Sequence, residues 1–337
     1  MKRIAYVAGA IAIGAMMVWP AAAQQPAQMA AAVGSNMNHV PSFVGVEKGI
    51  FLKHGIDLKL KVLATGQQMT NALQAGEVQV IGSAYSNYPL AVERGINARG
   101  VVGLMGDRTG VYSDDPVSIW TRKGSGITKI EDLAGRKVGT PVGGTADEYL
   151  GVALTKKGLS REKVNLLNVP PGNLVSALQG GGVDAVAVWE PFGSMIQSKI
   201  PDAVLVQRGG GYIGYYINMA VQNDFVEKSP ELVERYVIGM AEATQYTRQN
   251  PDEAAQIATR WIEGLDVAVA KQALRHMTFD SRITPHTIAA WEENVKILLE
   301  QKKLKSAIPW QQGVEPRFIE KVMKTYPQLF TDLKPVR

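Results

Sequence analysis

Short apolar runs alternate with helical patterns from Met29 to Gln207, and this alternation constrains the fold more than any other feature of the chain. The segment Asp57 to Leu63, for example, places three apolar side chains opposite two lysines. That period-two pattern is typical of a strand with one covered face. Strands that alternate with helices form β-α units around largely parallel sheets. The sequence therefore predicts an α/β protein.

Two glycine-rich stretches interrupt the pattern and predict two crossings between lobes. Lys123–Thr128 follows a strand at Val117–Thr121, and Gly209–Gly211 precedes a strand at Tyr215–Val221. We expect lobe 1 to begin with residues 24–123, lobe 2 to comprise 124–212, and residues 213–337 to return to lobe 1 with C-terminal helices packed on it. Two α/β lobes joined by two crossings make a hinged clamp, with its cleft at the carboxyl ends of the strands.

The first 23 residues have the order of a secretory signal, because Lys2 and Arg3 precede an apolar run that ends in Ala21–Ala23. A membrane-spanning helix needs about 20 apolar residues, so this shorter run predicts a cleaved signal and a mature N-terminus near Gln24. The chain contains no cysteine, which excludes disulfides, thiolate ligands and a cysteine-linked lipid anchor. We expect a periplasmic protein that is not anchored to a membrane.

Charge and motifs exclude several classes of function. Without Lys2 and Arg3 the chain carries 34 basic and 31 acidic residues, interspersed, and lacks the basic stripe of a nucleic-acid-binding protein. A G-x-G-x-x-G spacing at Gly209–Gly214 precedes a strand instead of a helix, so it does not indicate a dinucleotide site. Histidine spacing fits no metal site, and no Walker A, H-E-x-x-H, EF-hand or G-x-S-x-G motif occurs. We expect no catalytic residues, no cofactor and no metal.

Five loops next to predicted strands carry polar or aromatic side chains suited to binding a small solute. The candidate ligand-binding residues are Asn36, Asn38, His39, Gln67, Gln68, Ser83, Tyr85, Ser86, Asn87, Gly143, Gly144, Thr145, Trp189 and Glu190. The glycine pair lies between a strand and a helix, where backbone N–H groups and the helix dipole can hold an anion. Each loop also has a structural alternative, such as a turn, a helix cap, or a core position for Trp189.

Several stretches resemble the periplasmic solute-binding proteins of ABC importers for nitrate, sulfonates and taurine. They are PSFVGVEKGIFLKHGIDLKL, TNALQAGEVQVIGSA, ITKIEDLAGRKVGTPVGGTADEYL, LQGGGVDAVAVWEPF and NDFVEKSPELVERYVIGMAEATQY, in family order. The resemblance implies a two-lobed periplasmic-binding-protein fold of type II, a monomer that presents its solute to a membrane permease. It also implies that the five loops above bind the ligand. Gln79 departs from the family phrase, which usually has Asp there, at a strand position that bears on the fold.

These features together predict a receptor for a small anionic organic solute of the sulfonate, carboxylate or nitrate class. Because the candidate loops contain no arginine, we expect a singly charged or partly apolar ligand instead of a dianion. Three alternatives stay open: a receptor for pyrimidines or thiamine precursors, a sensor that serves a signalling receptor, and an enzyme of thiamine-pyrimidine synthesis. The fungal enzymes of that last class use a histidine and a cysteine-rich iron motif, and this chain has no cysteine.

Overall fold

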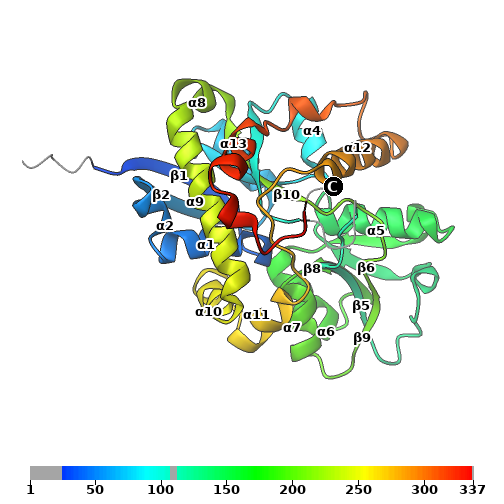
Figure 1. Ribbon diagram of the computed structural model, residues 1–337. Coiled ribbons are helices and arrows are strands. Elements are labelled where there is room, and N and C mark those ends of the chain that lie inside the picture. The colour runs from blue at the N-terminus through cyan, green and yellow to red at the C-terminus, as the bar shows by residue number, and fades with distance from the viewer. Residues whose placement is uncertain (1–24, 107–111, 336–337) are drawn as a thin grey trace, which may run out of the picture.

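The computed structural model describes residues 25–106 and 112–335, which form two α/β lobes (Figure 1). The predicted signal peptide, residues 1–23, lies outside the described residues and stays a prediction. Within the described part of the chain, no helix combines the length and apolar character needed to cross a membrane.

Lobe 1 contains a five-stranded sheet in the order β2-β1-β3-β10-β4. Strand β1 runs parallel to β2 and β3, and β10 runs antiparallel to both of its neighbours, β3 and β4. The strands are β1 Ala27–Gly34, β2 Ile56–Leu63, β3 Val80–Ala84, β4 Ala98–Gly103 and β10 Ile217–Gln222. The helices between them are α1 Val40–Glu47, α2 Ile50–Lys53, α3 Gly66–Gln74 and α4 Tyr88–Glu93. Gly49 adopts a left-handed φ of 66° and separates α1 from α2.

Lobe 2 contains the second sheet, in the order β7-β6-β8-β5-β9. The strands are β5 Val117–Arg122, β6 Lys137–Thr140, β7 Asn165–Asn168, β8 Ala185–Trp189 and β9 Ala203–Arg208, with helices α5 Thr145–Lys156, α6 Leu174–Gln179 and α7 Phe192–Lys199. The predicted boundary at residues 123 and 124 is wrong, because β5 pairs with β8 and β9. The chain therefore enters lobe 2 before Val117, and the glycine-rich stretch at Lys123–Thr128 is a turn within that lobe.

The two crossings between the lobes are bonded to each other. The Asp114 carboxylate, in the first crossing, accepts hydrogen bonds from the backbone N–H groups of Gly211, Tyr212 and Ile213 at 3.1, 2.7 and 3.4 Å. Burial raises the pKa of Asp114, and these three backbone bonds oppose the rise. Hydrogen bonds from backbone N–H groups favour the charged form of a carboxylate, so they stabilise Asp114 in its buried position between the crossings. The crossings thus form one hinge unit.

The helices that follow β10 pack mainly on lobe 1, as predicted. They are α8 Asn223–Lys228, α9 Pro230–Gln249, α10 Pro251–Trp261, α11 Val267–Leu274, α12 Pro285–Glu300 and α13 Arg317–Thr325. Stacked aromatic pairs join α1 to α10 through Phe43 and Trp261, and α2 to α9 through Phe51 and Tyr236. Proline occupies the first helical position of α9, α10 and α12, where its missing N–H has no helical partner.

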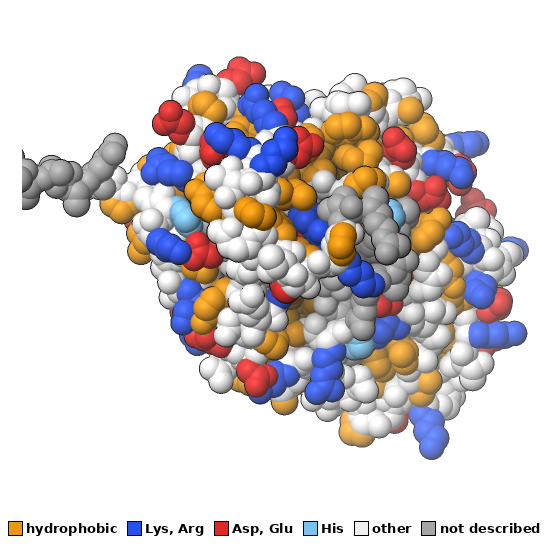
Figure 2. Space-filling view, viewed as in Figure 1, with side chains coloured by type: hydrophobic (Ala, Val, Ile, Leu, Met, Phe, Trp, Pro, Cys, Tyr) orange, Lys and Arg blue, Asp and Glu red, His pale blue; other side chains and the backbone are white. Residues whose placement is uncertain are grey.

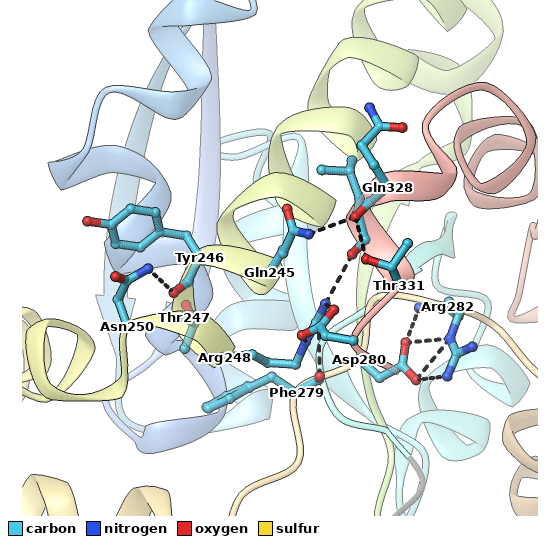
Figure 3. Close-up of polar contacts among 12 residues, drawn as sticks. Gln245, Tyr246, Thr247, Arg248, Asn250, Phe279, Asp280, Arg282, Gln328 and Thr331 are labelled. Atoms are coloured by element: carbon cyan, nitrogen blue, oxygen red, sulfur yellow. Dashed lines mark hydrogen bonds and ion pairs between the residues drawn. The ribbon is translucent and has the colours of Figure 1, made fainter. Parts of the chain in front are cut away.

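Two arginines, Arg248 and Arg282, with side chains 12% and 9% exposed, attach the C-terminal tail to lobe 1 (Figure 3). Arg248 of α9 donates to both carboxylate oxygens of Asp332 at 2.8 Å and to the carbonyl of Phe279 at 3.3 Å. Arg282 donates to the Asp280 carboxylate and to the Lys334 carbonyl. The segment around Asp280 pairs with residues 103–106, where the first crossing begins. The tail therefore helps to fix the chain at the lobe 1 end of the hinge.

Candidate functional site

Loops from the two lobes are in direct contact where the lobes face each other. The Ser86 hydroxyl donates to Thr145 Oγ1 at 3.0 Å, and Asn87 Nδ2 donates to the Gly143 carbonyl at 3.1 Å. A backbone bond of 3.4 Å also joins the Met37 N–H to the Glu190 carbonyl. The structure thus brings together four of the five predicted loops, two from each lobe.

The first loop turns sharply after β1 and carries three of the candidate residues. Asn36 Oδ1 accepts a hydrogen bond from the Asn38 N–H at 3.1 Å, which is the capping role left open by the sequence. The buried Asn38 Oδ1 accepts from the Tyr215 hydroxyl at 3.0 Å. Tyr215 lies just after the second crossing, so this bond ties the first loop to the hinge.

His39 lies completely buried against the sheet of lobe 1. Its imidazole packs over Gly82 of β3, where an added Cβ would lie 2.0 Å from the ring. Burial lowers the pKa of His39 to about 3, so the ring is neutral at physiological pH. Its Nδ1 has no hydrogen-bond partner among the described residues. A buried polar atom without a partner is unusual in a folded protein and is a candidate contact for a ligand.

Some side chains of the loop after β3 lie in the core of lobe 1, and others contact lobe 2. Ser83 bonds to Asn218 on the neighbouring strand β10, and Tyr85 packs edge-on against Trp291 of α12 with ring centroids 5.3 Å apart. Both side chains are buried within lobe 1. Only Ser86 and Asn87 reach lobe 2, so these two residues carry the cleft contacts of this loop.

The loop at Gln67 and Gln68 is not brought into these contacts. Both side chains are exposed, and Gln68 accepts hydrogen bonds from the Ala64 and Thr65 N–H groups at 3.0 and 3.2 Å. With Thr65 it forms a reciprocal capping box at the start of α3. Gln67 bonds to Asn71 one turn along the same helix. Local helix capping accounts for the contacts of this loop.

The glycine pair of lobe 2 precedes α5, with Gly144 at the N-cap and Thr145 as the first helical residue. Thr145 is therefore not the cap, and its hydroxyl instead bonds to Ser86 across the cleft. The Gly143 N–H donates to the Asp147 carboxylate at 2.8 Å. The Gly144 N–H donates to the Pro141 carbonyl at 3.0 Å, so both N–H groups of the glycine pair are already bonded within the protein.

Trp189 is the last residue of β8, and Glu190 follows it. Their side chains make different contacts. The Trp189 indole is 9% exposed, lies against Gly144, and its Nε1 has no hydrogen-bond partner among the described residues. Glu190 is fully buried, pairs with Arg208 at 2.8 Å, and accepts from the Ser194 N–H in the first turn of α7 at 3.1 Å. Burial raises the pKa of Glu190, and Arg208 opposes the rise. The helix-capping alternative thus describes Glu190, whereas Trp189 keeps a free donor.

Three described cations that contact residues of these loops or of α5 are paired with carboxylates. Arg208 pairs with Glu190, Arg161 with Asp147, and Lys303 with Glu148. A solute among the loops would therefore meet N–H and hydroxyl donors of neutral groups. Across the visible face, basic and acidic side chains are interspersed (Figure 2). Among the described residues, no three acidic or histidine side chains are grouped so as to hold a metal ion.

Three partners of the candidate residues were not predicted from the sequence. Asn218 bonds to Ser83, Tyr215 bonds to Asn38, and Arg208 pairs with Glu190, each from more than 15 residues away in the chain. Tyr215 and Asn218 lie in or beside a strand whose apolar pattern indicated only a core position. The polar residue Asn218 inside that buried strand was the one available signal.

Comparison with known proteins identifies the family. A family profile described as NMT1/THI5 like matches residues 36–254, more than half of the chain. The chain belongs to the NMT1/THI5-like family. This confirms the resemblance drawn from the sequence.

Two relatives of this NMT1/THI5-like protein are binding proteins by name. A binding protein of Brucella abortus is 26% identical over 225 residues, which are 65% of this chain and 66% of the relative. The taurine-binding periplasmic protein of Escherichia coli is 28% identical over 217 residues, 63% of this chain and 64% of the relative. The chain thus matches slightly less than two thirds of the length of these relatives.

The same architecture occurs in solved structures. The alkanesulfonate-binding protein of Xanthomonas axonopodis pv. citri bound to MOPS superimposes with a TM-score of 0.74 at 19% identity, covering 87% of this chain and 100% of that one. This likeness shows the fold alone. The NMT1/THI5-like protein therefore has the two-lobed type II periplasmic-binding-protein fold, as the sequence predicted.

Proposed function

We propose that this protein is the solute-binding component of an ABC importer and captures a small anionic organic solute in its cleft. The observation that carries the proposal is the direct meeting of Ser86 and Asn87 with Gly143 and Thr145 across the two lobes. A solute that bonds to both lobes stabilises the closed clamp by its extra contacts in that state. Membership of the NMT1/THI5-like family and the binding-protein relatives support this function.

The polar groups around the cleft favour one class of solute. Three described cations that contact these loops or α5 are paired, and α5 carries Asp147 and Glu148 in its first turn. Because Arg161, Arg208 and Lys303 are each paired with a carboxylate, none of the three is left to balance the second charge of a dianion, whereas a single negative charge can be held by N–H and hydroxyl donors. Trp189 offers an apolar wall together with a free indole N–H. We therefore infer a monoanionic sulfonate, carboxylate or nitrate-class ligand with a small apolar part.

The proposal includes a location and a partner. The predicted signal sequence favours a periplasmic location, and the absence of cysteine argues against an anchor linked through that residue. The closed complex would be presented to a membrane permease, which takes up the solute. No covalent step is involved in binding, so the solute should be recovered unchanged.

Ligand screening by thermal unfolding tests this function. Taurine, alkanesulfonates, nitrate, aromatic carboxylates and pyrimidines are added in turn while the melting temperature is followed. A ligand at 100 times its dissociation constant adds about 2.7 kcal/mol to the free energy of unfolding. Mass spectrometry then shows whether the bound solute is returned intact. If no small solute raises the melting temperature, the receptor function is refuted, and a chemically altered solute would favour the enzyme alternative.

Variants at the glycine turn test where the solute binds. The double variant Gly144→Val with Thr145→Ala should abolish the ligand-induced shift while the ligand-free protein still melts cooperatively. Thr155→Ala is the matched control, because that hydroxyl bonds only to the Gly151 carbonyl of the same helix, at 3.0 Å. Unchanged affinity in the double variant would place the ligand elsewhere.

A further inference from the structure

An ion pair joins the two lobes beside the cleft, where the end of α12 meets α5 (Figure 1). Lys303 follows α12 in lobe 1, and its Nζ lies 2.5 Å from Oε1 of Glu148. Glu148 belongs to the first turns of α5, the helix that begins at Thr145. The pair therefore acts on the same helix end that faces Ser86 and Asn87.

The lobe 1 side of this contact is fixed to the hinge. Asn294 of α12 donates to the carbonyl of Gly214, in the second crossing, at 2.8 Å. At the other end of the helix, Gln301 approaches Gly151 of α5, where an added Cβ would lie 3.6 Å from the Gln301 amide nitrogen. Because α12 is bonded to the second crossing, Lys303 is held on the lobe 1 side of its contact with Glu148.

The two charges of the pair are buried to very different degrees. The Glu148 side chain is 2% exposed and that of Lys303 is 31% exposed. The second carboxylate oxygen of Glu148 has no hydrogen-bond partner among the described residues. The other charged groups near Glu148 are Asp147, which repels it, and Arg161, which is bonded to Asp147. Burial raises the pKa of Glu148 although Lys303 opposes the rise.

We propose that Glu148 and Lys303 are positioning residues that set how readily the two lobes close. Opening the clamp separates the pair and returns the Glu148 carboxylate to water, whereas closing removes that water. Without Lys303 the closed state holds a buried carboxylate that lacks its partner, which strongly disfavours it. The effect on solute affinity rests on the proposed receptor function, but the effect on closure does not.

Three variants separate this role from a general structural role. Lys303→Met leaves Glu148 buried and unpaired, so the affinity for taurine, used as the probe, should fall about 10-fold or more. Glu148→Gln removes the buried charge, and both this variant and the double variant should bind taurine within about 3-fold of the wild type. The control is Lys321→Met, which breaks an exposed pair with Glu234 inside lobe 1. It should leave affinity unchanged.

Distances between spin labels test closure without any ligand. Because the chain has no cysteine, Leu52→Cys in lobe 1 and Leu167→Cys in lobe 2 give two unique labelling sites, with residues that are 53% and 39% exposed. Lys303→Met should shift the ligand-free distribution toward longer distances, and adding Glu148→Gln should restore it. Identical distributions for the wild type and Lys303→Met, or a shift that Glu148→Gln does not restore, would overturn the proposal. A shift without taurine binding would count only against the proposed ligand.

Discussion

The buried pair of Glu190 and Arg208 gives the sharpest test of how lobe 2 is held together at the cleft. Arg208 Nη1 lies 2.8 Å from Glu190 Oε1, and the two side chains are 14% and 0% exposed. Replacing Arg208 with Met keeps much of the side-chain stem but removes the charge. Of the two hydrogen-bond donors to Glu190 described above, the Ser194 N–H then remains and the Arg208 guanidinium is lost.

The expected loss follows from the burial of the carboxylate. Removing one partner of a buried ion pair costs about 3–5 kcal/mol, and the remaining Ser194 bond favours the lower value, about 3 kcal/mol. Replacing Glu190 with Gln in the same chain should recover most of that loss, because no charge stays buried. The matched control is Arg260→Met, whose pair with Glu47 is 53% and 30% exposed and should cost at most about 1 kcal/mol.

The pH dependence has a definite sign. The pKa of Glu190 is raised in the folded protein, so the folded state binds a proton more tightly than the unfolded state. The destabilisation is therefore present at neutral pH and is relieved as the pH falls through the folded pKa toward the unfolded value of about 4.3. Urea unfolding of Arg208→Met at pH 7.5 and 5.5 measures this. A loss below about 1 kcal/mol, or a loss that does not change with pH or with Glu190→Gln, would refute the reasoning.

Three further predictions concern other ionisable side chains. The pKa of His39 is lowered to about 3, so wild-type stability should fall by up to about 1.4 kcal/mol per pH unit below pH 6.5, and His39→Gln should flatten this slope in urea unfolding. The pKa of Glu148 is raised in the closed state, so spin-label distances should shorten as the pH falls from 7.5 to 5.5, and Glu148→Gln should abolish the change. Arg248→Met should destabilise the protein by about 2 kcal/mol and speed proteolysis near Asp332, as mass spectrometry of the fragments would show.

The sequence alone determined the α/β class, the two lobes and the order of most elements. These features follow from the period of apolar residues and from local capping, which depend on neighbours a few positions away in the chain. Proline at the start of α9 and α10 and the alternation in β2 were therefore predictable. The family phrases also located the loops that meet across the cleft.

The tertiary structure decided the roles that depend on distant partners. The sequence of β5 predicts a strand, but its pairing with β8 and β9 is what places it in lobe 2. A glutamine beside a glycine suits a ligand or a helix cap equally well, and the capping box of Gln68 was visible only in the structure. Likewise Glu190 meets Arg208, and Glu148 meets Lys303 from the other lobe. Such pairs form because folding brings remote segments together. The local sequence pattern does not indicate which cation a buried carboxylate will pair with.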